Sequence, residues 1–213
     1  MAIRAILWDF GNTLADERFM HAPLDGAPDW SPVFRGIHRT GLVEKWNLGQ
    51  ITSNDVAVSL AAELEIEPSR IVAHMRECCR NIHFYPVVMD LVANCAAPQA
   101  IVTINPDIFT EVIVPTYDLS AKFPAIVTSW QEGTLSKADL CEVAMGRLDR
   151  SLRLPECVLI DNKLENVLEW RARGGAAYHF DGAASLADRF TAILEGRFAG
   201  TWHHSAPSKR LAP

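Results

Sequence analysis

The sequence lacks any long apolar run. No stretch approaches the roughly 20 consecutive apolar residues that a membrane-spanning helix requires. The first apolar run, Ala5 to Trp8, is short and ends in Asp9, which is unlike a secretory signal peptide. Internal repeats and low-complexity segments are also missing. We therefore expect a soluble protein with no membrane partner, whose 213 residues suffice for one domain with a modest insertion.

Basic residues are in the minority. The chain has 20 Lys and Arg residues against 26 Asp and Glu residues, which gives a net charge of -6. Because proteins that bind nucleic acids usually present a basic stripe to the phosphate backbone, this balance predicts no nucleic-acid partner. An anionic substrate would instead need a local cluster of hydrogen-bond donors.

Cysteine is sparse and irregularly spaced. The five cysteines are an odd number and do not have the spacing of a zinc finger: Cys78, Cys79, Cys95, Cys141 and Cys157. We interpret them as reduced thiols in a cytoplasmic protein. Cys78 and Cys79 could form a redox pair, but two adjacent cysteines in a helical stretch are more often packing residues.

Five short runs of β-branched and aliphatic residues predict buried parallel strands. The runs are Ile3 to Trp8, Gln99 to Thr103, Ala125 to Thr128, Cys157 to Ile160 and Ala176 to Phe180. Helix-length segments lie between the later runs, and they begin with start signals such as Asn105-Pro106-Asp107 and Ser136. This alternation predicts an α/β fold with a doubly wound, Rossmann-like parallel sheet.

The alternation is interrupted between residues 16 and 85, where no strand pattern occurs. His21 to Gly36 is rich in Pro, Gly and aromatic residues and predicts an irregular linker. Helix starts follow at Thr52 and at Pro68, each before apolar residues at helical spacing. We predict an α/β core of residues 1–15 and 86–200, a small all-helical cap of residues 16–85, and a weakly ordered C-terminal tail of residues 201–213.

Polar residues follow the predicted strands at the places where a substrate would bind. Ligands of open α/β sheets bind beyond the carboxyl ends of the strands. There the sequence places Asp9, Thr103 and the pair Asp161-Asn162, and Lys137 follows the third strand across a loop. Each residue alone is typical of a turn or a helix cap, so the argument rests on the set.

Lys137 is unusual because it falls in the first turn of a predicted helix. Ser136 has the character of an N-cap, and Asp139 completes a capping-box-like pattern. The helix dipole disfavours a cation in the first turn by a few tenths of a kcal/mol, roughly. A nearby anion would offset this unfavourable interaction. The cost is also small enough for Lys137 to be an ordinary surface lysine.

Together these residues resemble the four motifs of the haloacid dehalogenase-like hydrolase superfamily, in order and with the expected spacing. Ile6 to Leu14 resembles the first motif, Ile101 to Thr103 the second, Gly133 to Asp139 the third, and Val158 to Val167 the fourth. The resemblance extends to about Phe190. It implies a magnesium-dependent hydrolase that acts on a small phosphorylated compound, with Asp9 as the nucleophile that forms an aspartyl-phosphate.

The chemistry explains why such a set is needed. A carboxylate that attacks a phosphate dianion meets a repulsion of about 4 kcal/mol per charge pair, at roughly 4 Å and an effective dielectric constant of about 20. A cation must offset this repulsion, and Mg²⁺ prefers oxygen ligands. The proposed catalytic residues are Asp9, Thr103 and Lys137; the phosphate-binding residues are Gly11, Asn12, Thr103, Ile104 and Lys137; the metal ligands are Asp9, the Gly11 carbonyl, Asp161 and Asn162.

Two positions depart from the pattern of this superfamily. Gly11 stands where most phosphatases of the superfamily carry a second Asp as general acid and base, and Asn162 stands where a second Asp is common in the fourth motif. A general acid contributes about 10² to 10⁴ in rate. We therefore expect the best substrates to be acyl or aryl phosphates, whose leaving groups depart without a proton. A water or a cap residue could supply the proton instead, with Glu17, His21, Arg35 and His38 as candidates.

Two other functions remain open. A 2-haloacid dehalogenase would also use Asp9 and would not need the second Asp, but such enzymes typically have a Ser-Ser-Asn fourth motif and do not need magnesium. A binding or regulatory protein on a decayed hydrolase scaffold would account for Gly11 and Asn162, but not for the retention of Asp9, Thr103, Lys137 and Asp161. The sequence leaves the substrate and the oligomeric state undetermined.

Overall fold

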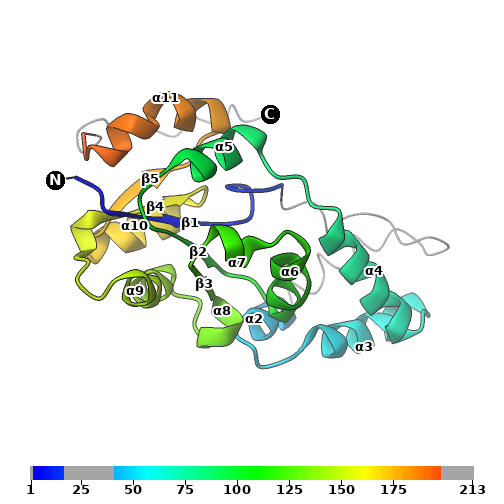
Figure 1. The fold of residues 1–213 in the computed structure, drawn as a ribbon. Coiled ribbons are helices and arrows are strands. Elements are labelled where there is room, and N and C mark those ends of the chain that lie inside the picture. The colour runs from blue at the N-terminus through cyan, green and yellow to red at the C-terminus, as the bar shows by residue number, and fades with distance from the viewer. Residues whose placement is uncertain (1, 17–40, 198–213) are drawn as a thin grey trace, which may run out of the picture.

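A five-stranded parallel sheet forms the centre of the protein (Figure 1). The computed structural model describes residues 2–16 and 41–197. The strands are β1 (Ala5–Trp8), β2 (Gln99–Thr103), β3 (Ala125–Thr128), β4 (Cys157–Asp161) and β5 (Ala176–His179). Their order in the sheet is β3-β2-β1-β4-β5, and every neighbouring pair is parallel. The predicted α/β class and all five predicted strands are confirmed.

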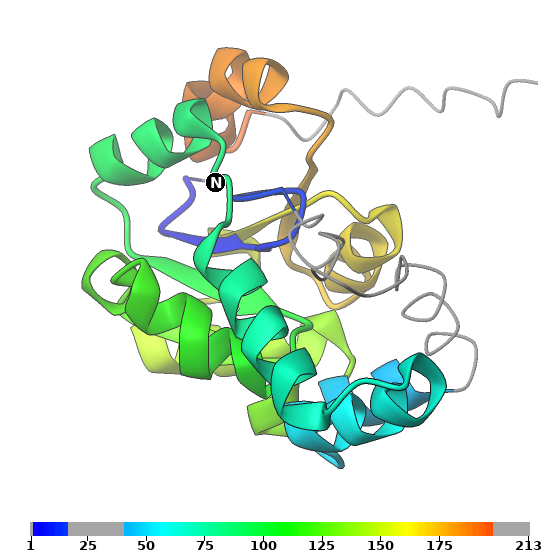
Figure 2. The same ribbon diagram turned by 90° about the vertical axis from the view of Figure 1, so that its right-hand side faces the viewer.

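Helices cover both faces of the sheet, which is why the strands are mostly apolar. Side chains of β1 alternate between two hydrophobic clusters: Leu7 belongs to one, and Ile6 and Trp8 belong to the other. The cluster around Leu7 is covered by α9 (Lys137–Leu148) and α10 (Leu164–Ala172). The opposite cluster is covered by α5 (Pro86–Asn94) and α11 (Ala183–Leu194), which lie together in Figure 2.

Shorter helical segments complete the core. They are η2 (Phe109–Ile113), α6 (Val114–Thr116), α7 (Leu119–Lys122), α8 (Ser129–Glu132) and η3 (Leu154–Glu156). The helix predicted after Asn105 begins at Asp107, but η2 within it is a wider π-helical turn. Pro115, two residues after the end of η2, has no N–H to continue a regular ladder.

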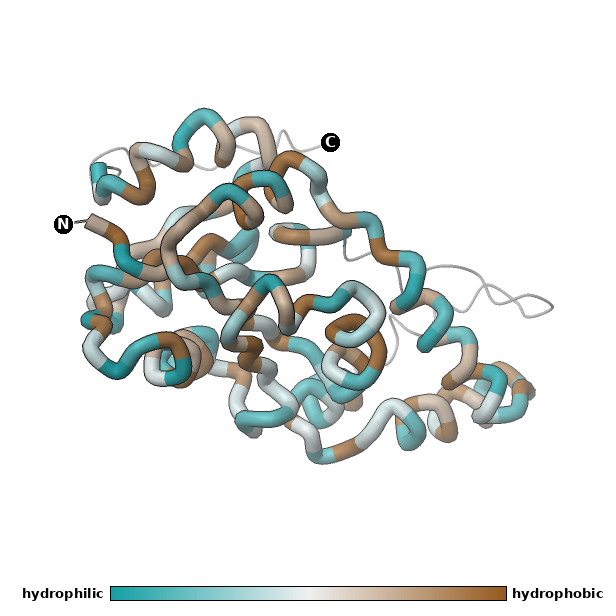
Figure 3. The backbone as a smooth tube through the Cα atoms, in the orientation of Figure 1, coloured by the Kyte–Doolittle hydropathy of each residue, from teal (hydrophilic) through white to brown (hydrophobic). Residues whose placement is uncertain are grey.

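The described part of the insertion is helical, as predicted. It contains α2 (Leu42–Asn47), α3 (Ser53–Leu64) and α4 (Pro68–Arg80), and no strand lies between residues 41 and 82. Thr52 begins α3 with a capping box to Asp55, and Pro68 begins α4. Teal and brown stretches alternate along α4 in Figure 3, and its apolar side joins the cluster of the core. The linker predicted for His21 to Gly36 and the tail 201–213 lie outside the described residues.

The chain leaves the core and returns to it at one place. The Asp16 N–H donates to the His83 carbonyl at 2.9 Å, and the Tyr85 N–H donates to the Leu14 carbonyl at 2.9 Å. These two antiparallel contacts close the insertion at its base, close to the boundaries 16 and 85 that the sequence predicts.

The cysteines form no disulfide with one another. Burial raises the pKa of the Cys79 thiol to about 12 and also raises the pKa of Cys78. A raised pKa suppresses the thiolate, so these neighbours are packing residues rather than a redox pair. Within residues 2–16 and 41–197, no helix is both long enough and apolar enough to span a bilayer.

Candidate active site

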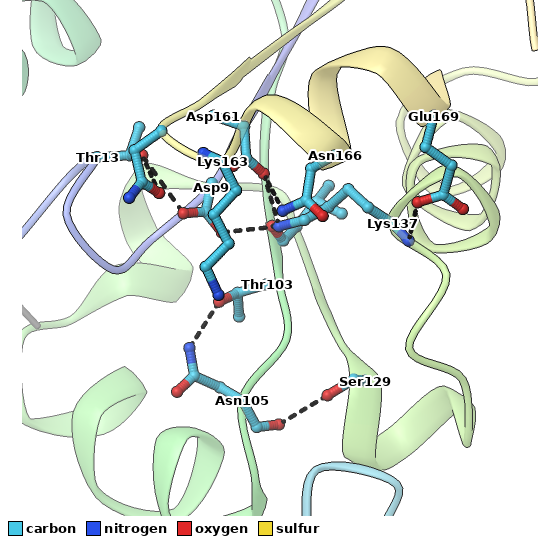
Figure 4. A network of polar contacts seen from close by, with 12 residues as sticks. Asp9, Thr13, Thr103, Asn105, Ser129, Lys137, Asp161, Lys163, Asn166 and Glu169 are labelled. Carbon is cyan, nitrogen blue, oxygen red and sulfur yellow. Dashed lines mark hydrogen bonds and ion pairs between the residues drawn. The ribbon is translucent and has the colours of Figure 1, made fainter. Parts of the chain in front are cut away.

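The polar ends of three strands meet at one edge of the sheet (Figure 4). Trp8 is in register with Ile101 of β2 and with Ile160 of β4. Asp9, Thr103 and Asp161 therefore come to the same edge, since parallel strands end together. Lys137, at the start of α9, reaches the same place from beside the sheet. Four residues that are far apart in the sequence are thus gathered as predicted.

Lys137 is fully buried and connects the two aspartates. Its ammonium group donates to Asp9 Oδ1 at 2.7 Å and to the Val102 carbonyl at 2.9 Å, and it lies 3.1 Å from Asp161 Oδ2. Burial alone would lower the pKa of Lys137, but the charges of Asp9 and Asp161 outweigh it and raise this pKa above its usual value. The lysine therefore carries a fixed positive charge at the floor of the site.

Asp9 is a buried carboxyl with a raised pKa. Burial raises the pKa of Asp9 from 3.8 to about 6, and the charge of Asp161 adds to this effect, while the charge of Lys137 opposes it. Its second oxygen accepts a hydrogen bond from the Thr13 hydroxyl at 3.3 Å. At neutral pH the group is thus a weakly solvated anion held in a fixed orientation, which suits a nucleophile.

The turn after Asp9 is closed by backbone hydrogen bonds. The N–H groups of Thr13, Leu14 and Ala15 donate to the Phe10 carbonyl, and the Asn12 N–H donates to the Ala15 carbonyl at 2.6 Å. Asn12 has a left-handed backbone, with φ of 56°. Since its N–H is used within the turn, Asn12 shapes the loop rather than offering this amide to a phosphate.

Oxygen atoms converge beside Asp9 in a way that fits a magnesium ion. The outer atom of the Asn162 amide lies 3.3 Å from Asp9 Oδ2 and 3.1 Å from the Gly11 carbonyl oxygen. The hydrogen-bonding pattern favours nitrogen in this place, where the amide donates to both atoms; turned over, the amide would add its oxygen to those of Asp9 and Gly11 as a possible ligand of Mg²⁺. Within the described ranges no cluster of three His, Cys, Asp or Glu side chains could hold a metal. A site for Mg²⁺ would therefore use few carboxylates together with carbonyl oxygens, as Mg²⁺ tolerates.

Asp161 is directed toward its own loop and toward Lys137. One oxygen accepts from the Lys163 N–H at 2.7 Å, and the other accepts from the Asn166 side chain at 2.9 Å. Asn166 is buried and lies in the stretch that resembles the fourth motif. Its place in that stretch is the sequence feature that could have indicated its contact with Asp161. These contacts fix Asp161, which is fully buried, beside Asn166 and the ammonium group of Lys137 (Figure 4).

Thr103 is buried, and its hydroxyl oxygen accepts a hydrogen bond from the Asn105 side chain at 2.6 Å. The hydroxyl proton therefore remains for another acceptor, such as a phosphoryl oxygen. Ile104 is partly buried and packs against the cluster around Leu7, so a contact with phosphate would have to come from its backbone N–H. Sequence reasoning missed Asn105 as a partner of Thr103, because it had the appearance of a helix-start residue.

The position of Lys137 in a first helical turn has a structural explanation. The Ser136 side chain accepts from the Asp139 N–H, as the predicted N-cap requires. The reciprocal half of the predicted capping box is wrong, because the Asp139 carboxylate pairs with Arg173 at 2.6 Å instead. The Ser136 N–H donates to the Thr134 hydroxyl at 3.1 Å, and Glu169 of α10 accepts from the Ser136 hydroxyl at 2.6 Å and from the Lys137 N–H at 3.1 Å. Two carboxylates, Glu169 and Asp9, thus offset the unfavourable dipole at Lys137.

Comparison with known proteins supports the fold. No protein-family model matches the sequence, and no curated protein matches it. A predicted HAD-like family hydrolase from Porphyromonas gingivalis has a similar structure, with a TM-score of 0.64 and 13% identity over 91% of this chain and 98% of the other. A HAD family enzyme from Bacteroides thetaiotaomicron in complex with magnesium and inorganic phosphate has a TM-score of 0.63 and 14% identity over 83% of this chain and 93% of its own.

A third similar structure is an L-2-haloacid dehalogenase from Xanthobacter autotrophicus. Its TM-score is 0.64, with 15% identity over 89% of this chain and 83% of the dehalogenase. At such identities the likeness concerns the fold, and it extends both to an enzyme with magnesium and phosphate bound and to a dehalogenase. The chain therefore has the haloacid dehalogenase-like hydrolase fold.

Proposed function

We propose that the protein is a magnesium-dependent phosphomonoester hydrolase that acts on a small phosphorylated metabolite through an aspartyl-phosphate on Asp9. The observation that carries this proposal is the contact of Lys137 with both Asp9 and Asp161, at 2.7 and 3.1 Å. It brings a carboxylate nucleophile and a buried cation to one point, with the Thr103 hydroxyl nearby (Figure 4). A binding protein would have no need of the buried anion at Asp9, which is costly to keep beside Asp161.

The proposed reaction has two steps. A carboxylate oxygen of Asp9 attacks phosphorus, the ester P–O bond breaks, and the leaving oxygen takes the bonding electron pair. Water then cleaves the aspartyl-phosphate, which releases inorganic phosphate and restores Asp9. Lys137 and Thr103 would hold the phosphoryl oxygens while their charge redistributes. Mg²⁺, held by Asp9, the Gly11 carbonyl, Asp161 and Asn162, would offset the repulsion between carboxylate and phosphate.

The glycine at position 11 has a specific consequence in this scheme. Gly11 offers a carbonyl oxygen but no acid to protonate the leaving group. We therefore propose a preference for acyl and aryl phosphates. The candidate proton donors Glu17, His21, Arg35 and His38 lie outside the described residues. We also propose that the segment 16–85 is a cap, because its base is joined to the turn that follows Asp9.

The proposal is tested with paired substrates. We expect an aryl phosphate to be hydrolysed with Mg²⁺, to lose this turnover with a chelator, and to exceed an alkyl phosphate of similar size by about 10²-fold or more. The measurement is release of inorganic phosphate, with 2-chloropropionate and chloride release as the parallel reaction. Equal rates on the two phosphates would contradict the leaving-group preference. Chloride release that persists in chelator would establish the dehalogenase, the second candidate, which the similarity to the Xanthobacter enzyme favours.

Magnesium binding should weaken as the pH falls through about 6. Folding raises the pKa of Asp9 from 3.8 to about 6, so the folded chain holds this proton more tightly than the unfolded chain between these values. In the metal-free protein the contribution of Asp9 to stability therefore falls as the pH rises through that window. A proton on Asp9 also competes with the metal, so affinity should fall about tenfold per pH unit below the pKa.

The measurement is the rise in unfolding temperature caused by Mg²⁺ at pH 7.5 and at pH 5. We expect a clear rise at pH 7.5 and little or none at pH 5. In the control Asp9→Asn, the magnesium effect should be small at both pH values. An equal rise at both pH values in the wild type would show that the metal binds without Asp9.

A further inference from the structure

Asp107 is a buried carboxylate that joins the inserted helices to the core. It follows β2 by four positions and is 6% exposed. One oxygen accepts from Trp46 Nε1 of α2 at 2.8 Å, from the Ser53 hydroxyl at 2.5 Å and from the Ile108 N–H at 2.9 Å. The other accepts from the Ser53 N–H at 2.8 Å, in the first turn of α3. Two helices of the insertion thus depend on one side chain of the core.

The same segment of the core carries Thr103. Asn105, midway between Thr103 and Asp107, donates from its side chain to the Thr103 hydroxyl at 2.6 Å. Its carbonyl accepts from the Ser129 hydroxyl at 3.3 Å, so both ends of Asn105 are held (Figure 4). Pro106 restricts the backbone between Asn105 and Asp107. A displacement at Asp107 would therefore be passed along a short, stiff connection to Thr103.

The described part of the insertion also approaches the core at Gly49 and at Arg76. Gly49, between α2 and α3, has φ of 69° and lies against the Trp130 carbonyl of α8 so closely that a Cβ atom would overlap it. This contact is steric and supplies no hydrogen bond of the Asp107 kind. The exposed pair Arg76 and Glu111, at 2.8 Å, ties α4 to η2 farther along the chain and is worth little by itself.

We propose that Asp107 is a positioning residue that couples the inserted helices α2 and α3 to the hydroxyl of Thr103. This inference rests on the proposed function in one respect, the role of Thr103 toward a phosphoryl group. Asp107 acts through Asn105 and α3 and touches no reacting atom. When α2 and α3 move away from Asp107, Thr103 should then be displaced as well. The site would lose the Thr103 hydroxyl as a phosphate ligand.

The chain offers a matched control for this proposal. Asp55 also caps the first turn of α3, accepting from the Thr52 N–H at 2.8 Å and from the Thr52 hydroxyl at 2.7 Å. Unlike Asp107, Asp55 is exposed and makes these contacts within the insertion. Asp55→Asn should therefore weaken α3 without reaching β2, whereas Asp107→Asn should affect both.

The test is hydrogen exchange of the metal-free protein, which requires no turnover. In Asp107→Asn we expect exchange to become about tenfold faster both in the first turn of α3 and in residues 103–108. In Asp55→Asn only the first turn of α3 should change. If Asp107→Asn alters α3 but leaves residues 103–108 unchanged, Asp107 is a structural anchor and the proposed coupling is wrong.

A second variant protects the test against misfolding. Trp46→Phe keeps an aromatic ring but removes the N–H that donates to Asp107, so it should reproduce a smaller version of the same joint change. Where phosphatase activity is present, Asp107→Asn should lower kcat/KM by about tenfold, with Asp55→Asn near the wild type. If exchange becomes faster in both segments but the wild type has no phosphatase activity, the coupling is upheld and the proposed function is refuted. If phosphatase activity is present but only α3 exchanges faster, the proposed function is upheld and the coupling is refuted.

Discussion

Replacement of Lys137 by methionine should lower the free energy of unfolding more than any substitution on the surface. Methionine has a similar length, but it leaves Asp9 and Asp161 facing each other without the ammonium group between them, and it leaves the Val102 carbonyl without its donor. Removal of one partner from a buried ion pair typically costs about 3 to 5 kcal/mol, because the remaining charges are uncompensated. We expect a loss of this size in the free energy of unfolding, measured by urea denaturation at pH 7.5 with a chelator.

The control for this variant is Lys122→Met. Lys122 is exposed, and its ammonium group also donates to a backbone carbonyl, that of Tyr117 at 2.9 Å. A surface substitution of this kind should change stability by about 0.5 kcal/mol or less. The Lys137 variant should also recover part of its stability near pH 5, where Asp9 takes up a proton and the repulsion decreases. A loss below about 1 kcal/mol at pH 7.5 would contradict the buried triad.

The core of this fold could be predicted from sequence because its strands are buried on both faces. Such strands consist mostly of apolar residues, so each appears as a short apolar run, and the polar residue that ends the run marks the edge where ligands bind. Asp9, Thr103 and Asp161 are found in this way. The parallel order of the strands then brings them together without any further information.

Contacts between distant elements could not be predicted in the same way. Asp107 has the local character of a helix-start residue, and nothing near it in the sequence indicates Trp46 or Ser53 as its partners. The local pattern predicts that Asp139 completes a capping box. Instead Arg173 pairs with the Asp139 carboxylate, and Glu169, also from outside α9, accepts from the Lys137 N–H. Local patterns describe what a residue can do with its neighbours; a residue 30 or more positions away can override this once packing brings it close.

Replacement of Asp9 by asparagine should abolish activity while the protein stays folded. The amide is a poor nucleophile, so we expect a loss of about 10⁴-fold or more in kcat/KM on any phosphate that the wild type hydrolyses. Stability should not fall in parallel. Because burial raises the pKa of Asp9 to about 6, its ionised form is unfavourable in the metal-free fold at pH 7.5, and the neutral amide removes that cost. Lys137 keeps Asp161 at 3.1 Å as its counter-charge, so no buried charge is left without a partner. We expect an unfolding temperature equal to that of the wild type or higher.

This combination separates a catalytic role from a structural one. A catalytic carboxylate that is ionised in a buried site lowers the stability of the fold while it supplies activity. Its removal should therefore lower kcat/KM without lowering the unfolding temperature. Asp139→Asn is the control, since it removes an exposed carboxylate that pairs with Arg173 and should leave kcat/KM unchanged. If Asp9→Asn retained the rate of the wild type on any substrate, Asp9 would not be the nucleophile for that reaction; no turnover of any phosphate or haloacid by either protein would favour a binding module. If it lost both activity and fold, Asp9 would be a structural partner of Lys137, and the nucleophile would have to be sought elsewhere.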